Sequence, residues 1–196
     1  MRWRALLVCL VLAGAPVGCG GSSSHSSTRA TTKETADPPA TPLPGWSRLV
    51  NDTAGFSLSL PPGWRATRSS AGSSLIRSSD RALAVAVSAD RSNDGEGDPP
   101  ATYLDRTVRH LPGYRDLRAG RAVARPGLRY RAAGLKATGV FQRTGVRQAI
   151  TLYALHRPGA VTYTLAVFRS AATPAGRYAP YLAALLRSFR ARPAQV

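Results

Sequence analysis

Cysteine is nearly absent from this 196-residue sequence. The two cysteines, Cys9 and Cys19, both lie near the N-terminus, so the rest of the chain has no thiol for a disulfide or a nucleophile. Histidine is scarce too. After residue 44 the sequence has only His110 and His156, and neither is spaced with another His or a carboxylate as a zinc site requires. The sequence therefore predicts neither a disulfide-stabilised domain nor a metal site.

Acidic residues are the second shortage. The chain has 27 Lys and Arg but only 10 Asp and Glu, which gives a formal net charge of +17. After Asp116 there is no acidic residue at all, although 13 Arg and Lys136 follow it. A catalytic pair of carboxylates would have to come from the earlier residues, and no spacing there selects two of them. The nucleophile-elbow motif G-x-S-x-G is also missing. We therefore expect a protein that is not an enzyme and uses no cofactor.

No apolar run is long enough to cross a membrane as a helix. The longest, residues 5–17, follows Arg2 and Arg4 and has the length of the apolar part of a signal peptide, whereas a spanning helix needs about 20 residues. Two cleavage sites are open. Cleavage at the A-x-A motif of residues 13–15 would secrete the protein, but it would leave Pro16 beside the cleaved bond. Cleavage before Cys19 avoids this and is favoured.

The residues before Cys19 indicate a lipid anchor. Val17-Gly18-Cys19 resembles the bacterial lipobox, in which small residues precede a cysteine that takes a diacylglyceryl thioether, although Pro16 stands where the lipobox usually has Leu. Once residues 1–18 are removed as the signal peptide, Cys19 is the one remaining thiol, and an attachment point explains it. The resemblance implies a palmitate-type anchor at Cys19 and a protein at the extracytoplasmic face of the cell membrane.

Residues 19–44 are predicted to be a disordered tether. They are rich in Ser, Thr, Gly, Pro and Ala and have no apolar periodicity, so they cannot bury enough surface to offset their chain entropy. About 25 flexible residues have a root-mean-square span of about 25–30 Å, which holds a domain clear of the lipid headgroups. Residues 45–193 then form a single domain of ordinary size.

Alternation of apolar and polar residues predicts the strands of this domain. They are residues 56–60 with one buried face, a short strand at 75–76, and then 82–88, 117–125, 128–136, 147–156 and 161–169. The pair 117–125 and 128–136 forms a hairpin around Pro126-Gly127. The last two strands form the strongest hairpin, and they are apolar on both faces, which is typical of central strands covered on both sides.

Two stretches have the apolar spacing of helices. The first opens at Pro99 with Asp98 as its N-cap, ends at Pro112-Gly113, and pairs Asp105 with Arg109. Its apolar stripe is Ala101, Leu104, Val108 and Leu111. The stripe of the closing helix is Tyr178, Leu182, Leu185, Leu186 and Phe189.

The links between strands are of hairpin length, which predicts an antiparallel sheet of about six to seven strands in an α+β domain. The helices must lie on this sheet to bury their stripes. Alanines recur on the strands at residues 82–86 and 132–133. They fit either a hollow in the sheet or close packing of a helix on it, and close packing is preferred.

The run Phe56-Ser57-Leu58-Ser59-Leu60-Pro61-Pro62-Gly63-Trp64, the mid-chain helix, the four long strands and the closing helix together resemble the Mog1/PsbP-like fold. Small lipoproteins of high-GC Gram-positive (actinobacterial) bacteria often use this fold. The resemblance covers most of residues 45–192. It implies an accessory, assembly or ligand-associated protein, and it supplies no catalytic residues.

We therefore expect a non-catalytic envelope lipoprotein that acts as an accessory or binding module for a protein or an envelope component. The alternative is a carrier of a small hydrophobic ligand or lipid in a pocket between sheet and helix.

The positive charge has two interpretations. Nucleic acid is not expected as a partner, because the protein is exported and has no basic helix. An anionic bilayer would attract an exposed strand face that carries Arg129 and Arg131. Alternatively, the arginines are a feature of composition, since Lys33 and Lys136 are the only lysines.

Overall fold

The computed structural model describes residues 44–70, 72–91, 98–157 and 161–192. The predicted signal peptide, Cys19 and nearly all of the predicted tether lie outside these ranges. Within them, no helix has the length and apolar character needed to cross a bilayer. The same residues contain no cluster of three His, Cys, Asp or Glu side chains that could hold a metal ion.

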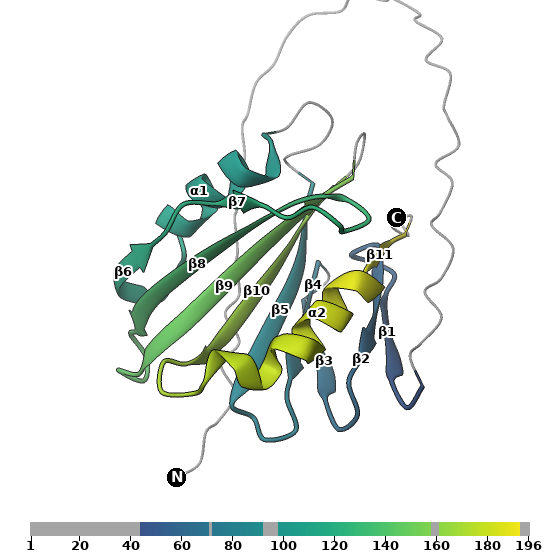
Figure 1. The fold of residues 1–196 in the computed structure, drawn as a ribbon, viewed down its shortest axis with the longest axis horizontal. Coiled ribbons are helices and arrows are strands. Elements are labelled where there is room, and N and C mark those ends of the chain that lie inside the picture. Colours follow the sequence, from purple (N-terminus) through teal and green to yellow (C-terminus); the bar gives the residue numbers. More distant parts are fainter. Residues whose placement is uncertain (1–43, 71, 92–97, 158–160, 193–196) are drawn as a thin grey trace, which may run out of the picture.

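The described residues form two antiparallel sheets and two α-helices (Figure 1). The strands are β1 (Ser47–Asn51), β2 (Phe56–Leu60), β3 (Arg65–Ser70), β4 (Ser73–Arg77), β5 (Leu83–Asp90), β6 (Tyr114–Ala119), β7 (Val123–Ala124), β8 (Arg131–Phe141), β9 (Arg147–His156), β10 (Thr162–Ser170) and β11 (Arg190–Ala191), and the helices are α1 (Pro100–Arg109), the 3-10 helix η1 (Ala175–Tyr178) and α2 (Ala179–Ser188). The large sheet has the order β3-β4-β5-β10-β9-β8-β6, with β7 paired to β8, and the small sheet has the order β1-β2-β11. The predicted α+β class and antiparallel sheet are confirmed.

The number of strands was predicted too low. The sequence of β3, RATRSS, is almost entirely polar, and β11 has only two residues, so neither carries an alternating pattern. The strand predicted at residues 117–125 is replaced by two shorter ones, β6 and β7. Apolar alternation therefore revealed the central strands and missed those at the edges.

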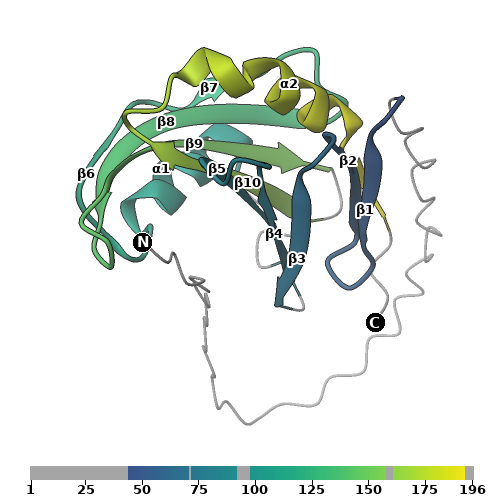
Figure 2. The same ribbon diagram turned by 90° about the horizontal axis from the view of Figure 1, so that it is seen from below.

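The large sheet has two covered faces, each with its own apolar core. On one face, which we call the α1 face, Leu152 and Ala154 of β9 pack with Leu104 and Val108 of α1. On the other, the α2 face, Leu155 of β9 packs into a core that includes α2. Figure 2 shows α1 below the sheet and α2 above it. The prediction of cover on both sides is confirmed for β10, whose first six residues are all buried. On the α2 face of β9 it holds only at Leu155, because Thr151 and Tyr153 are partly exposed.

The alanines of β8 serve close packing on the α1 face. Ala133 and Ala137 are buried there among the side chains of α1. Small side chains let a helix approach a sheet closely, so on this face the preferred interpretation of the alanines holds. The hydroxyl of Tyr103 on α1 also donates to Asp90 Oδ2 at 3.0 Å, which ties the helix to the end of β5.

Two predicted interactions of α1 are wrong. Asp98 does not cap the helix, whose N-cap is Pro99, and it pairs with Arg106 at 2.5 Å instead. Asp105 does not pair with Arg109, because its Oδ1 accepts the backbone N–H of Ala122 at 3.1 Å. Each carboxylate thus binds a group other than the predicted one: Asp98 binds the side chain of Arg106, and Asp105 binds the backbone of Ala122.

The prediction of one buried face for β2 is also wrong, because all five of its residues are buried. Phe56 stacks on Phe189 at the end of α2, with ring centroids 5.9 Å apart. On the same strand, the backbone N–H of Ser59 donates to Ser188 Oγ at 2.9 Å. Alternation within β2 cannot reveal these contacts with the end of α2.

Asp80, in the turn between β4 and β5, fixes the start of α2. Ser78 Oγ donates to its carboxylate at 2.6 Å, the Tyr178 hydroxyl donates to it as well, and Arg177 pairs with it at 2.8 Å. The hydrogen bonds from Ser78 and Tyr178, followed by that of the Ala82 N–H and the charge of Arg177, lower the pKa of Asp80 from its usual 3.8 to about 2.

We expect Asp80→Asn to lower the melting temperature at neutral pH. A carboxyl whose folded pKa lies below its unfolded pKa adds stability above the unfolded value and loses it as the pH falls through the folded one. The difference between wild type and variant should therefore be largest above pH 4 and shrink between pH 4 and pH 2. Thermal melts across this range test it, and a difference that is constant with pH would show that the charge of Asp80 has no role.

Candidate functional site

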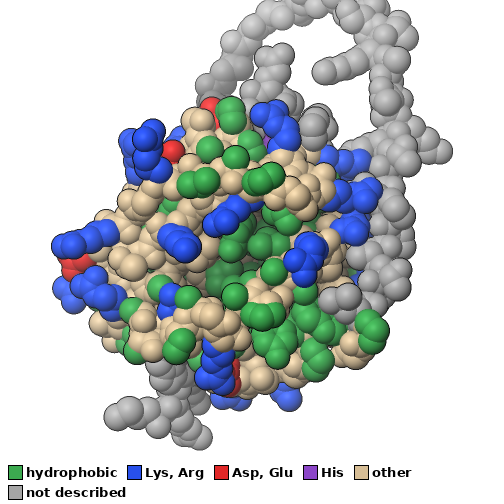
Figure 3. All heavy atoms as spheres, viewed as in Figure 1, with side chains coloured by type: hydrophobic (Ala, Val, Ile, Leu, Met, Phe, Trp, Pro, Cys, Tyr) green, Lys and Arg blue, Asp and Glu red, His purple; other side chains and the backbone are tan. Residues whose placement is uncertain are grey.

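A hollow lies on the α2 face of the large sheet. The helix α1 covers β8 and β9 on the α1 face, whereas α2 lies along β2 and leaves part of the α2 face of β8 and β9 open, so that Lys136 is exposed and Tyr153 is only partly buried. Figure 3 shows the hollow near the middle of this face, with hydrophobic side chains inside it and Lys and Arg side chains around it. We call it the α2-face hollow.

One wall of the hollow is the segment of residues 120–130, which we call the arm. The backbone N–H of Arg125 donates to the carbonyl of Ala132 at 2.8 Å, and Gly127 takes a positive φ of 82° in the turn that leads back to β8. The Tyr130 hydroxyl accepts the backbone N–H of Ala191 at 2.9 Å. The arm is therefore fixed to the segment that follows α2, the opposite wall.

The floor of the hollow follows from the strand register, because paired residues on neighbouring strands project from the same face. The rows across β8, β9 and β10 on the α2 face are Ala132–Leu155–Tyr163, Gly134–Tyr153–Leu165, Lys136–Thr151–Val167 and Thr138–Ala149–Arg169, followed by the pair Val140–Arg147. The first two rows are apolar apart from the Tyr hydroxyls, and the later rows are increasingly polar and cationic. The hollow is thus polarised along the strands.

Gly134 makes room for Arg125 on this floor. A Cβ at position 134 would lie 2.7 Å from Arg125 Nε and 3.4 Å from the ring of Tyr153. The side chain of Arg125 therefore crosses the strand where no side chain stands and reaches the tyrosine. Burial raises the pKa of Tyr153, and the charge of Arg125 opposes this rise. The phenol is neutral at physiological pH and can donate a hydrogen bond.

Cations gather at the other end of the floor. Arg118 pairs with Thr138, and Arg115 and Arg147 pair with Val140 from its two sides. A β-bulge between Arg115 and Arg118 lets both pair on the α2 face, and Asp116, within it, has a positive φ of 51°. This bulge gives the edge strand two cations on one face where strict alternation would not.

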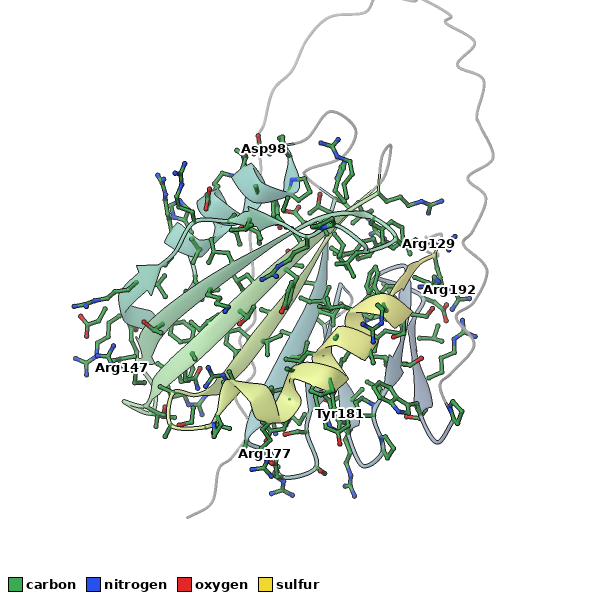
Figure 4. All side chains as sticks on the ribbon, viewed as in Figure 1. Asp98, Arg129, Arg147, Arg177, Tyr181 and Arg192 are labelled. Carbon is green, nitrogen blue, oxygen red and sulfur yellow. The ribbon has the colours of Figure 1, made fainter. Side chains whose placement is uncertain are left out.

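These cations lack acidic partners. Among the described residues, no salt bridge or side-chain hydrogen bond is formed by Arg115, Arg118, Arg125, Lys136 or Arg147. The ion pairs that are present lie elsewhere and join Asp52 to Arg192, Asp80 to Arg177 and Asp98 to Arg106. Figure 4 labels Arg177 and Arg192 well away from Arg147. The carboxylates of these pairs do not neutralise the cations of the hollow.

Comparison with known proteins identifies the fold of the domain. No family model matches the sequence, and no curated protein matches it either. The solved structures that match in fold include a Bacteroides thetaiotaomicron protein (TM-score 0.53, 15% identity, 76% of this chain and 49% of that chain), a point mutant of Mog1 (0.51, 10%, 75% and 96%) and LpqN of Mycobacterium tuberculosis, involved in cell envelope biogenesis (0.50, 16%, 76% and 86%). The chain has a Mog1-like fold. It spans about half the length of the Bacteroides protein.

In this Mog1-like domain the predicted membrane-contact residues do not lie on the floor of the hollow. Arg129 is exposed in the segment before β8, and Arg131, the first residue of β8, is exposed and pairs with His156 on the α1 face. Burial, and then the charge of Arg131, lowers the pKa of His156. The exposure of residues 128–132 alternates as predicted, and contact of this face with a bilayer stays a prediction.

A second pocket lies between β1 and β3. It has a volume of about 180 Å³ and is lined in part by Asn51, Thr67 and Ser74. Asn51 Nδ2 donates to Ser74 Oγ at 2.9 Å, and its Oδ1 accepts the backbone N–H of Ala54 at 3.0 Å. Because the Asn51 side chain is already paired, this pocket offers a ligand less than the α2-face hollow does.

Proposed function

We propose that the protein is a non-catalytic binding module of the cell envelope and that it holds a small hydrophobic or amphiphilic envelope component in the α2-face hollow. The observation that supports this most is the hollow between α2 and the arm, around which apolar side chains such as Tyr153, Leu182 and Leu186 are only partly buried. A soluble domain gains stability by covering such a surface, so an exposed one favours a ligand. The sequence alone favoured an accessory module for a protein or envelope component over a carrier of a small ligand. The hollow favours the carrier.

The chemistry of the hollow favours binding over catalysis. By register, no carboxylate and no histidine projects from its floor. Its polar side chains include Lys136, Thr138, Thr151 and Tyr153, which carry an ammonium group or neutral hydroxyls. None of these four side chains forms a hydrogen bond to another described residue. A general base with a pKa near neutrality is missing, so the site can hold a ligand but has no group suited to take its proton.

The proposed location follows from the N-terminal residues. A lipid anchor at Cys19 and a tether of residues 19–44 would keep the domain within reach of the extracytoplasmic surface of the membrane. There the hollow would meet envelope lipids and their precursors. LpqN, which is involved in cell envelope biogenesis, has the same fold, and this is compatible with the proposed setting.

A neutral fluorescent probe tests the hollow. We expect the full chain carrying Cys19→Ala to bind N-phenyl-1-naphthylamine at one saturable site. In Gly134→Val the new side chain would clash with Arg125 and fill the floor, because even a Cβ would lie 2.7 Å from Arg125 Nε. The methyl groups of the valine take space that the probe would use, so the probe buries less apolar surface. Because each buried CH₂ contributes about 0.8 kcal/mol, affinity for the probe should fall about tenfold.

Gly176→Val is the matched control, because a Cβ at Gly176 meets nothing within 4 Å. It should bind the probe as wild type does. Circular dichroism confirms that both variants are folded. Unchanged binding by Gly134→Val would place the site elsewhere, and the absence of any saturable binding by wild type would refute the proposed function.

A further inference from the structure

The hollow is apolar at one end and cationic at the other, and this polarity indicates the chemical class of its ligand. At the apolar end, Tyr130 lies edge-on to Phe189 with centroids 6.0 Å apart, and Leu128, Leu182 and Leu186 are only partly buried beside it. These side chains come from the arm and from α2, the two walls. They give this end of the hollow apolar walls, which suit an acyl chain.

The opposite end offers cations at short spacing. Lys136 and Thr138 are two residues apart on β8, and Arg118 is the cross-strand partner of Thr138. Lys136 and Arg118 are therefore diagonal neighbours on one face, which places them about 7–8 Å apart, within reach of a common group for long side chains. Arg125 reaches the floor from the arm at Gly134, one row nearer the apolar end than Lys136. Like charges at this spacing repel each other unless an anion lies between them.

The neutral donors point to the same kind of group. The hydroxyls of Thr138, Thr151 and Tyr153 lie in the rows around Lys136 and have no hydrogen-bond partner among the described residues. A group of donors with unpaired cations and no carboxylate matches a phosphate, which has several acceptor oxygens. Arginine adds the planar donor pair that binds phosphate in bidentate fashion.

We infer that the ligand of the hollow is a membrane amphiphile with a phosphate headgroup, bound with its headgroup between Lys136 and Arg118 and its acyl chain toward Tyr130 and α2. This inference rests on the proposed function, since it needs the hollow to be a binding site. It adds the charge of the ligand, its orientation and the residues that select it. The acyl chain of the ligand lies at the apolar end of the hollow, and its headgroup lies at the cationic end.

The test compares three probes below their micellar concentrations: dodecyl phosphate, dodecyl maltoside and inorganic phosphate. Calorimetric titration of the full chain carrying Cys19→Ala gives each affinity without detergent. We expect dodecyl phosphate to bind at least about tenfold more tightly than the neutral dodecyl maltoside, and inorganic phosphate to bind most weakly. Because the cations are exposed, this preference should shrink as salt shortens the Debye length to about 8 Å.

Paired charge removal locates the headgroup. Lys136→Gln with Arg118→Gln should weaken dodecyl phosphate binding about tenfold and leave dodecyl maltoside binding unchanged, since charge-assisted hydrogen bonds are lost. The control removes the same two charges elsewhere, at Arg65 and Arg109, which are exposed outside the hollow. It should bind all three probes as wild type does.

The outcomes separate the inference from the function on which it rests. Equal affinity for the charged and the neutral amphiphile would overturn the headgroup assignment and leave the proposed function intact. Inorganic phosphate that binds as tightly as dodecyl phosphate would show an anion site without a chain site and overturn the amphiphile. Binding of no probe would refute both proposals.

Discussion

Replacing Phe189 with Ala should lower the free energy of unfolding by about 3–5 kcal/mol, as burial of a large ring in a packed core predicts. Phe189 is 1% exposed. Its ring lies 5.9 Å from that of Phe56, 5.0 Å from that of Tyr163 and 6.0 Å from that of Tyr130, measured between centroids. One side chain thus joins the small sheet, the large sheet and the arm, and the cavity left by its loss cannot close easily.

Urea denaturation of the full chain measures this effect. Tyr181→Ala is the control on the neighbouring helix, because Tyr181 is 43% exposed, and its loss should cost less than about 1 kcal/mol. If Phe189→Ala cost no more than Tyr181→Ala, the end of α2 would not be packed as described.

Cys19→Ala should move the protein from the membrane fraction to the soluble fraction of the cells that export it. Two acyl chains give stable anchoring, because each buried CH₂ contributes about 0.8 kcal/mol, and the polar tether offers no substitute. Cys9→Ala is the matched control, because Cys9 lies in the predicted signal peptide and should leave membrane attachment unchanged. Cell fractionation measures the share of each variant in the membrane fraction. A Cys19→Ala protein that stays in the membrane to the same extent would refute the anchor.

The central part of the fold could be predicted from the sequence because burial imposes a strong pattern there. The bounds predicted for β9 agree with the structure. Of the stripe predicted for the closing helix, Tyr178, Leu185 and Phe189 are buried, and Leu182 and Leu186 are partly buried. The edges could not be predicted, since a strand such as β3 has few apolar side chains to alternate. Its pairing is decided by the neighbouring strand β4 rather than by its own residues.

The hollow could not be predicted because it depends on tertiary placement. The hollow is open because α2 lies along β2. Its cations share one face because of the bulge next to Asp116. Neither feature has a sequence signal. A partial signal was present at Gly134 and Lys136, a glycine and a cation two residues apart in a strand that is otherwise apolar at its buried positions. That pattern indicates a gap on one face of a sheet.

Native mass spectrometry of the full-length protein, purified from membranes in mild detergent, tests most directly whether the hollow is a binding site. We expect wild type and Gly176→Val to carry one noncovalently bound amphiphile per chain, and Gly134→Val to carry much less. A wild-type protein with no bound molecule, or a Gly134→Val protein that retains it equally, would contradict the assignment of the α2-face hollow.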